Sequence, residues 1–346
     1  MSIGNMVHKQ SDENQPSIVP SITDIDSESD PILDREQDPF PKPVADYIAR
    51  YDKVIGDRPH STWRWGYNGT PEVRLSCVDD ELENRVRTAK LLATMYITIA
   101  DDIAERHNDQ ATLAELIPIP FDNQSTDPEK DSVDSEIIDL STDIWNQFRE
   151  RYDASPRAAE FVDLFEFDLR QVLDAVEYSL LTNRSPDLVS EQELWTYDSY
   201  NMMVYVYAVI DLANAPEFDR ADLSTLRQVT HRTQRMARIG NWLATWQREL
   251  AEGDFSSGVV IRAVETDVIN REDLHTLRAT AEHGQASETV DEIVRSIERS
   301  SIEDDFLDRW RVEYAEAARF NDALESVDLE EYLEGFETIL DSYVAW

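Results

Sequence analysis

Residues 240–249 read GNWLATWQRE and form the most informative pattern in the chain. Asn241, Thr245 and Glu249 recur every four residues, so their oxygen-bearing side chains share one face of an α-helix. Two tryptophans lie in the same stretch, and tryptophan is unusual on a fully solvated face. An amide, a hydroxyl and a carboxylate in a row suit Mg²⁺, which completes its ligand shell with water or phosphate oxygens. The stretch therefore predicts a helix that binds a metal ion on one face.

A second candidate metal-binding group is the acidic pattern DDIAE at residues 101–105. The chain is so acidic that similar DDxxE or DDxxD patterns occur again at Asp79 and at Asp304. Those two copies lie where helices are expected to begin, and acids at a helix start interact favourably with the helix dipole. Residues 91–100 are almost entirely apolar, so the copy at Asp101 ends a buried helix. Acids there oppose the dipole and repel each other, which favours a bound cation as their partner.

Together the two patterns resemble the paired metal motifs of class I terpene synthases. They are 140 residues apart (241 − 101), and Arg248 precedes the final glutamate as a basic residue does in that family. The resemblance implies an all-α class I terpenoid synthase bundle that forms a single catalytic domain. It also implies three Mg²⁺ ions around the diphosphate of a prenyl substrate. It assigns two of these ions to Asp101, Asp102 and Glu105, the third to Asn241, Thr245 and Glu249, and a diphosphate contact to Arg248.

The same resemblance implies a reaction. Such an enzyme ionises a linear prenyl diphosphate, here geranylgeranyl or farnesyl diphosphate, and cyclises the carbocation to a terpene hydrocarbon or alcohol. We expect Tyr96 and Trp65 to line the dry pocket, where aromatic rings stabilise carbocations by cation–π attraction. Two positions differ from the family pattern. Asn201 stands where many bacterial members carry an arginine that senses the diphosphate, and Arg319-Phe320 is nearest to their C-terminal Arg-Tyr pair.

Two other functions stay open from the sequence. A prenyl chain-elongating or head-to-head prenyltransferase of the same fold would use two acidic motifs, which Asp101 and Asp304 could imitate. Their separation of 203 residues (304 − 101) is large for that purpose, and the pattern at residues 240–249 would then have no role. The other alternative is a non-catalytic acidic helical scaffold, in which the oxygen-rich helix faces are only solvated.

The composition is strongly acidic. The 346 residues include 72 acidic and 32 basic side chains, for a formal net charge of −40, and only five of the basic residues are lysines. An acidic, lysine-poor surface is typical of a protein kept soluble in the salt-loaded cytoplasm of a halophilic prokaryote, where salt screens its self-repulsion. A basic partner is the rival explanation. The charge argues against binding a nucleic-acid backbone, and the single cysteine, Cys77, excludes an internal disulfide and a cysteine-based zinc site.

The chain divides into a tail and one domain. Residues 1–38 are polar, acidic and rich in Ser, Asp and Pro, which predicts a disordered N-terminal tail, and residues 39–346 are expected to form the helical domain. No signal peptide and no apolar run of bilayer length is evident, so we expect a cytoplasmic monomer or homodimer without stable membrane insertion. Helical periodicity is expected from residue 44 and over 79–105, 137–152, 157–181, 192–212, 223–251, 256–268, 271–283, 289–302 and 306–344.

Overall fold

A computed structural model describes residues 30–34, 39–281 and 287–344 of the chain. Within these ranges every regular element is a helix and no strand occurs, which confirms the all-α prediction. None of these helices is both long enough and apolar enough to cross a bilayer. The α-helices are α1 (Lys42–Val54), α2 (His60–Gly69), α3 (Glu83–Glu105), α4 (Gln110–Leu116), α5 (Ser135–Asp153), α6 (Ala158–Arg184), α7 (Glu191–Thr196), α8 (Val204–Ala213), α9 (Leu223–Glu252), α10 (Gly258–Glu265), α11 (Arg271–Ala281), α12 (Ser287–Glu298), α13 (Ile302–Ala318) and α14 (Leu329–Val344).

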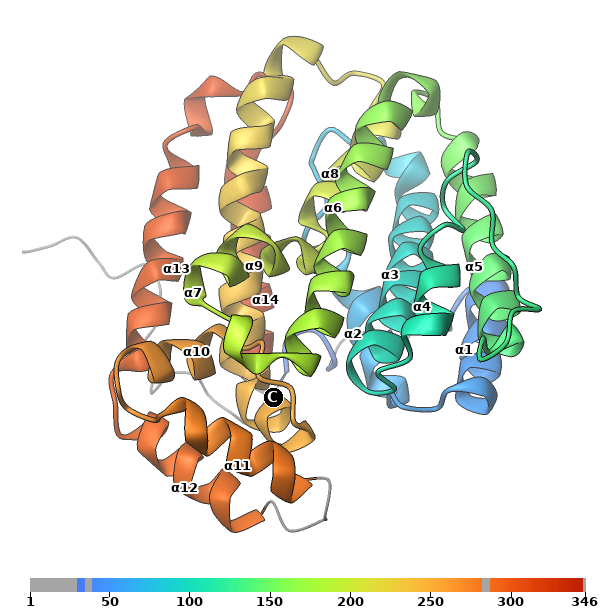
Figure 1. Ribbon diagram of the computed structural model, residues 1–346. Helices are drawn as coiled ribbons and strands as arrows, with labels where there is room; N and C mark the ends of the chain where they lie inside the picture. Colours follow the sequence, from blue (N-terminus) through green and yellow to red (C-terminus); the bar gives the residue numbers. More distant parts are fainter. Residues whose placement is uncertain (1–29, 35–38, 282–286, 345–346) are drawn as a thin grey trace, which may run out of the picture.

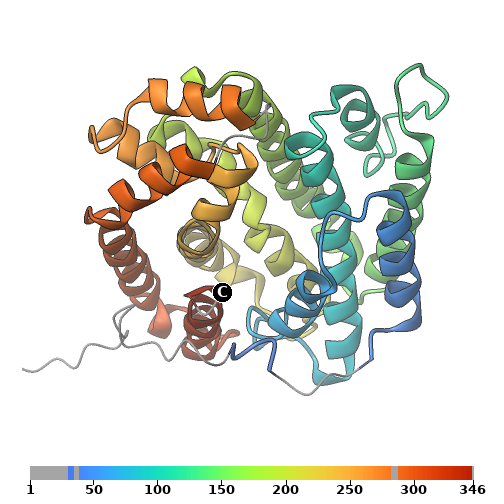
Figure 2. The same cartoon turned by 90° about the horizontal axis from the view of Figure 1, so that it is seen from below.

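Two long helices, α3 and α9, form the centre of the bundle. Helix α3 packs against α2, α5, α6 and α8, whereas α9 packs against α8, α13 and α14. Both helices end at the same end of the bundle, which is the lower end in Figure 1. Seen from that end, α9 and α14 are viewed almost along their axes (Figure 2). The predicted motifs at the ends of α3 and α9 are therefore brought to one end of the molecule.

The prediction for α9 agrees closely with the structure, because the sequence there contains both a clear period and a clear stop. The expected range was 223–251, and the helix spans Leu223–Glu252. Gly253 follows with φ of +84°, a left-handed conformation that glycine adopts without steric cost. Trp242 and Trp246 are buried, as expected for tryptophans that flank a functional stripe.

The expected continuous helix over residues 192–212 is wrong. The segment is divided into α7, the short 3₁₀ helix η4 (Asp198–Met202) and α8, with Met203 at a φ of +59° between the last two. Gln234 of α9 provides hydrogen-bond partners for backbone groups at the interruption. Its side-chain amide donates to the carbonyl of Ser199 and accepts from the N–H of Tyr205. A buried side chain from another helix therefore replaces the helical hydrogen bonds that the break removes.

The expected helix over residues 306–344 is also divided, into α13 and α14. Asp222 lies beside the interruption, and its Oδ2 accepts hydrogen bonds from the backbone N–H groups of Glu325 and Ser326 at 3.0 and 2.9 Å. Asp328 then accepts from the N–H groups at the start of α14. These carboxylates stabilise a loop in place of continued helix, which apolar periodicity alone does not reveal.

The expected N-terminal tail lies mostly outside the described residues, namely at 1–29 and 35–38. Residues 30–34 are described, and they pack on the bundle. Ile32 is fully buried, and its carbonyl accepts a hydrogen bond from Asn68 at 3.0 Å. Asp30 accepts a hydrogen bond from Ser342 of α14 at 2.6 Å. The packed structure therefore includes a short piece of the expected tail.

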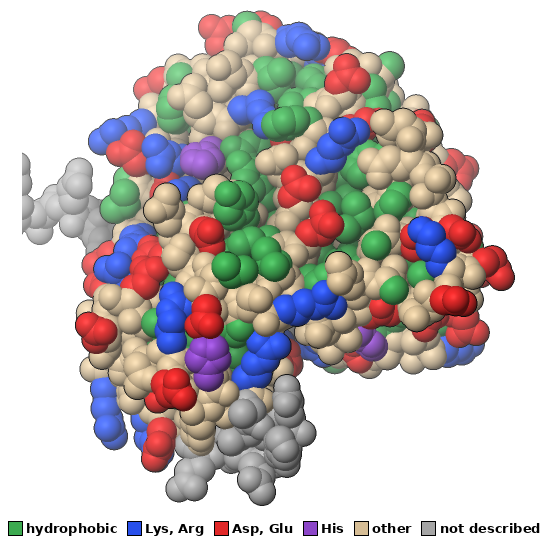
Figure 3. Space-filling model, viewed as in Figure 1, with side chains coloured by type: hydrophobic (Ala, Val, Ile, Leu, Met, Phe, Trp, Pro, Cys, Tyr) green, Lys and Arg blue, Asp and Glu red, His purple; other side chains and the backbone are tan. Residues whose placement is uncertain are grey.

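Among the described residues, most of the large apolar side chains that are exposed lie in or near α6 and α7, and Val312 of α13 is a further one. Phe167 and Leu181 of α6, with Leu188 and Tyr197 next to α7, are each about half exposed. Figure 3 shows apolar side chains gathered in the middle of this face, with acidic and basic side chains around them.

Candidate functional site

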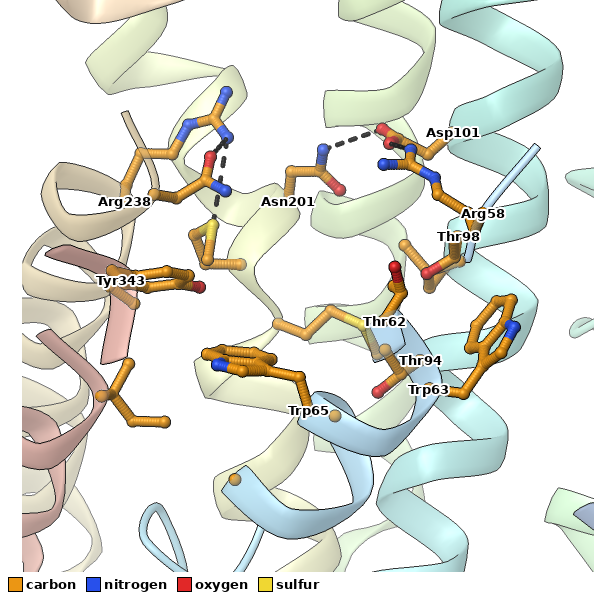
Figure 4. A pocket seen from close by; sticks show the side chains of 18 of the residues that line it. Arg58, Thr62, Trp63, Trp65, Thr94, Thr98, Asp101, Asn201, Arg238 and Tyr343 are labelled. Carbon is orange, nitrogen blue, oxygen red and sulfur yellow. Dashed lines mark hydrogen bonds and ion pairs between the residues drawn. The ribbon is translucent and has the colours of Figure 1, made fainter. Parts of the chain in front are cut away.

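A cavity of about 570 Å³ lies between α2, α3, α8, α9 and α14. Charged and amide side chains line the end where α3 and α9 terminate, and mainly apolar and aromatic side chains line the opposite end (Figure 4). The charged end includes Arg58, Asp101, Glu105, Arg106, Asn201, Arg238, Asn241, Arg248, Glu249, Glu252 and Asp254. The opposite end includes Trp65, Val73, Leu91, Phe336, Ile339 and Tyr343.

The carboxylates at the charged end of the cavity include Asp101 and Glu105 from α3, Glu249 from α9, and Asp254 just beyond α9. Burial raises the pKa of Glu105 well above its ordinary value, and Asp101, Asp254 and Glu249 raise it further. Burial, and then Asp254, likewise raise the pKa of Glu249 to about 7. Burial is the largest cause of both shifts, and repulsion from neighbouring carboxylates at the negative ends of two helices adds to it. A cation bound at this end would reduce that repulsion.

Asp254 reaches the cavity because α9 stops at Gly253 and the chain turns back. The N–H of Asp254 donates to the carbonyl of Glu249 at 2.9 Å. Oδ1 of Asp254 accepts hydrogen bonds from the N–H and the hydroxyl of Ser256 at 2.8 and 2.7 Å. The carboxylate is therefore held in a fixed orientation beside Glu249.

Asp101 and Asp102 are adjacent in sequence but have different surroundings. Asp101 lines the cavity, where its oxygens accept hydrogen bonds from Arg58 at 3.2 Å and from Asn201 at 3.0 Å. Asp102 is fully buried behind it and is not part of the cavity wall. Its oxygens accept from the Tyr51 hydroxyl at 2.6 Å and from Nε of Arg58 at 2.7 Å. A helix rotates about 100° per residue, so only one of the two can face the cavity. Asp102 was expected to contact a metal ion directly. In the structure it instead holds Arg58 in place.

Arg238 supplies a second guanidinium at the charged end. It is 6 % exposed, donates from Nε to Asp198 at 2.7 Å and donates from Nη1 to Oδ1 of Asn241 at 2.8 Å. The ion pair with Asp198 fixes Arg238, and Arg238 in turn fixes the amide of Asn241. Figure 4 shows Arg238 across the cavity from Arg58. Asn201, at the position where the family has its sensor arginine, instead donates to Asp101. The arginines at this end therefore come from other parts of the chain.

The Asn/Thr/Glu stripe of α9 is only partly directed at the cavity. Asn241 and Glu249 line it, whereas Thr245 does not, and the Thr245 hydroxyl donates to the carbonyl of Asn241 at 2.7 Å. Arg248 lies at the mouth, with its side chain 44 % exposed, and donates to Glu252 at 2.7 Å. To contact a ligand, the Arg248 guanidinium would have to exchange its ion pairs with Glu252 and Glu249.

The two aromatic predictions have opposite outcomes. Trp65 lines the cavity, stacks on Tyr343 with ring centroids 5.0 Å apart, and donates from Nε1 to Ser342 at 2.7 Å (Figure 4). Gly240 allows this stack, since a Cβ there would lie 2.8 Å from Cδ2 of Tyr343. Tyr96 lies outside the cavity: its hydroxyl donates to the carbonyl of Leu116 at 2.6 Å, and its ring packs on Trp145. Tyr96 is thus a core residue on the far side of α3, a correction to its expected place in the pocket.

The site residues that were not identified from the sequence include Arg58, Arg238 and Asp254. Arg238 carried a usable signal, because it precedes Asn241 by three residues and so shares its helix face. Arg58 and Asp254 lie in loops, where no periodicity indicates which element a side chain will meet. Of these two, only Asp254 had a hint, the Gly-Asp pair directly after α9.

The other two acidic copies are at helix starts, as expected. Asp79 caps the 3₁₀ helix η2 (Asp80–Leu82) by accepting from the N–H of Glu81. Asp304 and Asp305 lie in the first turn of α13. Neither of these two copies lines the cavity, whereas Asp101 and Glu105 of the third copy do.

The donor set at the charged end fits Mg²⁺. Carboxylate and amide oxygens of α3 and α9 line this end, and burial together with neighbouring carboxylates raises the pKa of Glu105 and of Glu249. In the part of the chain that is described, no three His, Cys, Asp or Glu side chains converge on one point. Mg²⁺ needs no such group, since it commonly binds one or two carboxylates and completes its shell with water and phosphate oxygens. Two separate sets of residues could hold such ions, namely the carboxylates of Asp101 and Glu105 on α3, and the amide of Asn241 with the carboxylate of Glu249 on α9.

Comparison with known proteins assigns no family. A scan against protein-family models finds no match for the chain, and a search of curated proteins finds no significant match. The function must therefore be inferred from the residues of the cavity.

The raised pKa of Glu249 predicts a pH-dependent stability. Its pKa is about 7 in the folded protein against an ordinary 4.5, so its ionisation disfavours the folded state. The stabilising effect of the bound proton is complete below the unfolded pKa and is lost as the pH rises through the folded pKa. Without divalent cations, we expect the melting temperature to fall between about pH 5 and pH 8, and Glu249→Gln to remove about 3 °C or more of that fall. Asp131→Asn, in an exposed loop, is the charge-matched control and should keep the wild-type slope. Equal slopes for Glu249→Gln and wild type would contradict the prediction.

Proposed function

We propose that the protein is a class I terpene cyclase, which ionises farnesyl or geranylgeranyl diphosphate with Mg²⁺ and cyclises the resulting carbocation to a terpene hydrocarbon or alcohol. One observation carries the proposal: a single cavity combines a charged end, formed by carboxylates and arginines, with an apolar and aromatic opposite end. A prenyl diphosphate has the matching form, with an anionic head and a long apolar tail. The resemblance of the two oxygen-rich motifs to those of terpene synthases supports the same assignment.

The diphosphate head would bind at the charged end. Arg238 is buried there, Arg58 and Arg106 are partly buried, and Arg248 is exposed. Guanidinium groups bind phosphate oxygens through paired, charge-assisted hydrogen bonds. Mg²⁺ ions, when bound, would stabilise the negative charge that develops on the leaving diphosphate. The C1–O bond of the substrate breaks, the electron pair leaves with the diphosphate oxygen, and an allylic cation remains.

The hydrocarbon tail would occupy the opposite end. The whole cavity, with both of its ends, has a volume of about 570 Å³, which lies within the usual range for a cavity that encloses a small molecule. Trp65 and Tyr343 present stacked aromatic rings to this space, and such rings attract a cation. The apolar wall also excludes water, which would otherwise trap the cation before a ring closes.

A binding experiment tests this assignment without requiring turnover. The melting temperature of the full chain is measured in molar potassium chloride, because salt screens its net charge of −40. We expect Mg²⁺ and inorganic diphosphate to raise the melting temperature by about 3 °C or more when added together, and far less when added singly.

Asn241→Ala should abolish this joint effect, since it removes an oxygen ligand of α9. Asn321→Ala, in the distant 3₁₀ helix η6 (Asn321–Ala323), is the matched control and should retain it. A melting temperature that does not respond to Mg²⁺ with diphosphate would favour a non-catalytic scaffold.

A further inference from the structure

Two hydroxyl groups lie on the wall of the cavity away from the charged end. Thr94 belongs to α3 and Tyr207 belongs to α8, and both line the cavity. Their oxygens are 2.5 Å apart, which makes this a short hydrogen bond. Oγ1 of Thr94 is also 2.8 Å from the backbone carbonyl of Lys90. The three oxygens therefore form a chain from the backbone of α3 to the ring of Tyr207.

The carbonyl oxygen of Lys90 determines which hydroxyl donates in each of these two hydrogen bonds. A carbonyl oxygen can only accept, so the Thr94 hydroxyl donates to Lys90. The Tyr207 hydroxyl must then donate to Thr94. Burial raises the pKa of Tyr207, so its hydroxyl keeps the proton at ordinary pH. Its oxygen retains lone pairs, and no other hydrogen-bond partner for it occurs among the residues that the structure describes.

Lys90, whose carbonyl accepts the Thr94 proton, is held in place by a buried ion pair of its side chain. Nζ of Lys90 donates to Asp211 at 2.8 Å and to the carbonyl of Val73 at 3.0 Å. It lies 5.4 Å from the centroid of the Tyr207 ring. Asp211 is the direct partner of Lys90, so the carboxylate opposes the charge of the ammonium group near the Tyr207 ring.

The position along α3 places this dipole deep in the cavity. Thr94 precedes Asp101 by seven residues, which is about 10 Å along a helix axis. In Figure 4, Thr94 and Trp65 lie in the lower part of the view, whereas Arg58 and Asp101 lie together in the upper part. A substrate whose head is at Asp101 would thus bring the middle or far part of its tail to Thr94 and Tyr207.

We propose that Tyr207 is a specificity-determining residue, whose oxygen lone pairs attract positive charge on the hydrocarbon tail and so select where the carbocation resides before it loses a proton. The inference rests on the proposed function. A dipole fixed in a dry cavity acts strongly on a cation, because little solvent screens it and no reorganisation is needed. Tyr207 makes no bond to the substrate. It lowers the energy of one cation relative to its isomers. By accepting the proton of the Tyr207 hydroxyl, Thr94 keeps that proton turned away from the cavity.

Product analysis of Tyr207→Phe tests the inference. The variant keeps the ring and removes the oxygen, so we expect the ratio of the two most abundant products to change by about fivefold or more, while total substrate consumption stays within about threefold of wild type. Tyr205→Phe is the matched control on the same helix. Tyr205 stacks on Tyr200 outside the cavity, so this variant should give the wild-type product ratio.

Variants of Thr94 provide an independent check on the proton order. Thr94→Val removes the acceptor of the Tyr207 proton and should move the product ratio in the same direction as Tyr207→Phe, whereas Thr94→Ser should leave it near wild type. An unchanged ratio in Tyr207→Phe, with an active wild type, overturns this inference and leaves the proposed function standing. A wild type that consumes no prenyl diphosphate overturns both.

Discussion

Asp101→Asn is expected to lower the turnover of prenyl diphosphate by about two to three orders of magnitude, the largest effect on activity of any single change considered. Asp101 is one of the two acidic residues of α3 that line the cavity, and it accepts hydrogen bonds from both Arg58 and Asn201. Asparagine keeps the size of the side chain but removes the negative charge that a cation and Arg58 share. The release of inorganic diphosphate under saturating Mg²⁺ measures the effect.

The chain contains a natural control for this change. Asp304→Asn alters the same kind of acidic pattern, but in the first turn of α13 and away from the cavity. It should retain activity within about twofold, as expected for a residue without contact to the substrate. Asp101→Asn should also melt at or above the wild-type temperature, since it relieves repulsion among the carboxylates. Near-wild-type turnover in Asp101→Asn would remove Asp101 from the metal site.

Lys90→Met is expected to destabilise the folded protein by about 3–5 kcal/mol, the largest effect on stability. Lys90 and Asp211 have fully buried side chains joined at 2.8 Å, and Asp211 also accepts a hydrogen bond from the N–H of Leu75. Methionine fills the volume of the lysine stem but leaves the carboxylate of Asp211 buried without its partner. Urea unfolding at constant salt measures the loss.

A double variant separates the lost charge pair from lost packing. Lys90→Met with Asp211→Asn has no buried charge and keeps an oxygen for the N–H of Leu75, so it should recover more than half of the lost stability. Lys53→Met, at an exposed position in the last turn of α1, should be close to neutral. If the single and double variants are equally unstable, packing and not the unpaired charge is responsible.

The helical architecture was accessible from the sequence because its signals are local. Apolar periodicity identified α3 and α9, and Gly253 marked the end of α9. The breaks at Met203 and near Asn321 were missed because their stabilising partners, Gln234 and Asp222, are distant in sequence. Tertiary hydrogen bonds that replace helical ones leave no periodic trace in the segment they interrupt.

The candidate site was accessible in part, for a related reason. Periodicity places Asn241 and Glu249 on one face, and the apolar run before Asp101 places it at the end of a buried helix. The apolar run does not indicate which of the two adjacent acids faces the cavity. Asp102 was therefore assigned to metal binding, although it anchors Arg58. Tyr96 was misplaced in the same way, since a helix buried on all sides gives no indication of which side faces a cavity.

The most direct test of the central proposal is gas chromatography of the products formed by the full chain from farnesyl and geranylgeranyl diphosphate, with Mg²⁺ in high salt. The account predicts that at least one substrate disappears only when Mg²⁺ is present, giving a cyclic hydrocarbon or alcohol and an equal amount of inorganic diphosphate. Added isopentenyl diphosphate should not be consumed, because only chain elongation uses it. Recovery of both substrates unchanged at every salt concentration, or consumption of isopentenyl diphosphate, would contradict the assignment as a terpene cyclase.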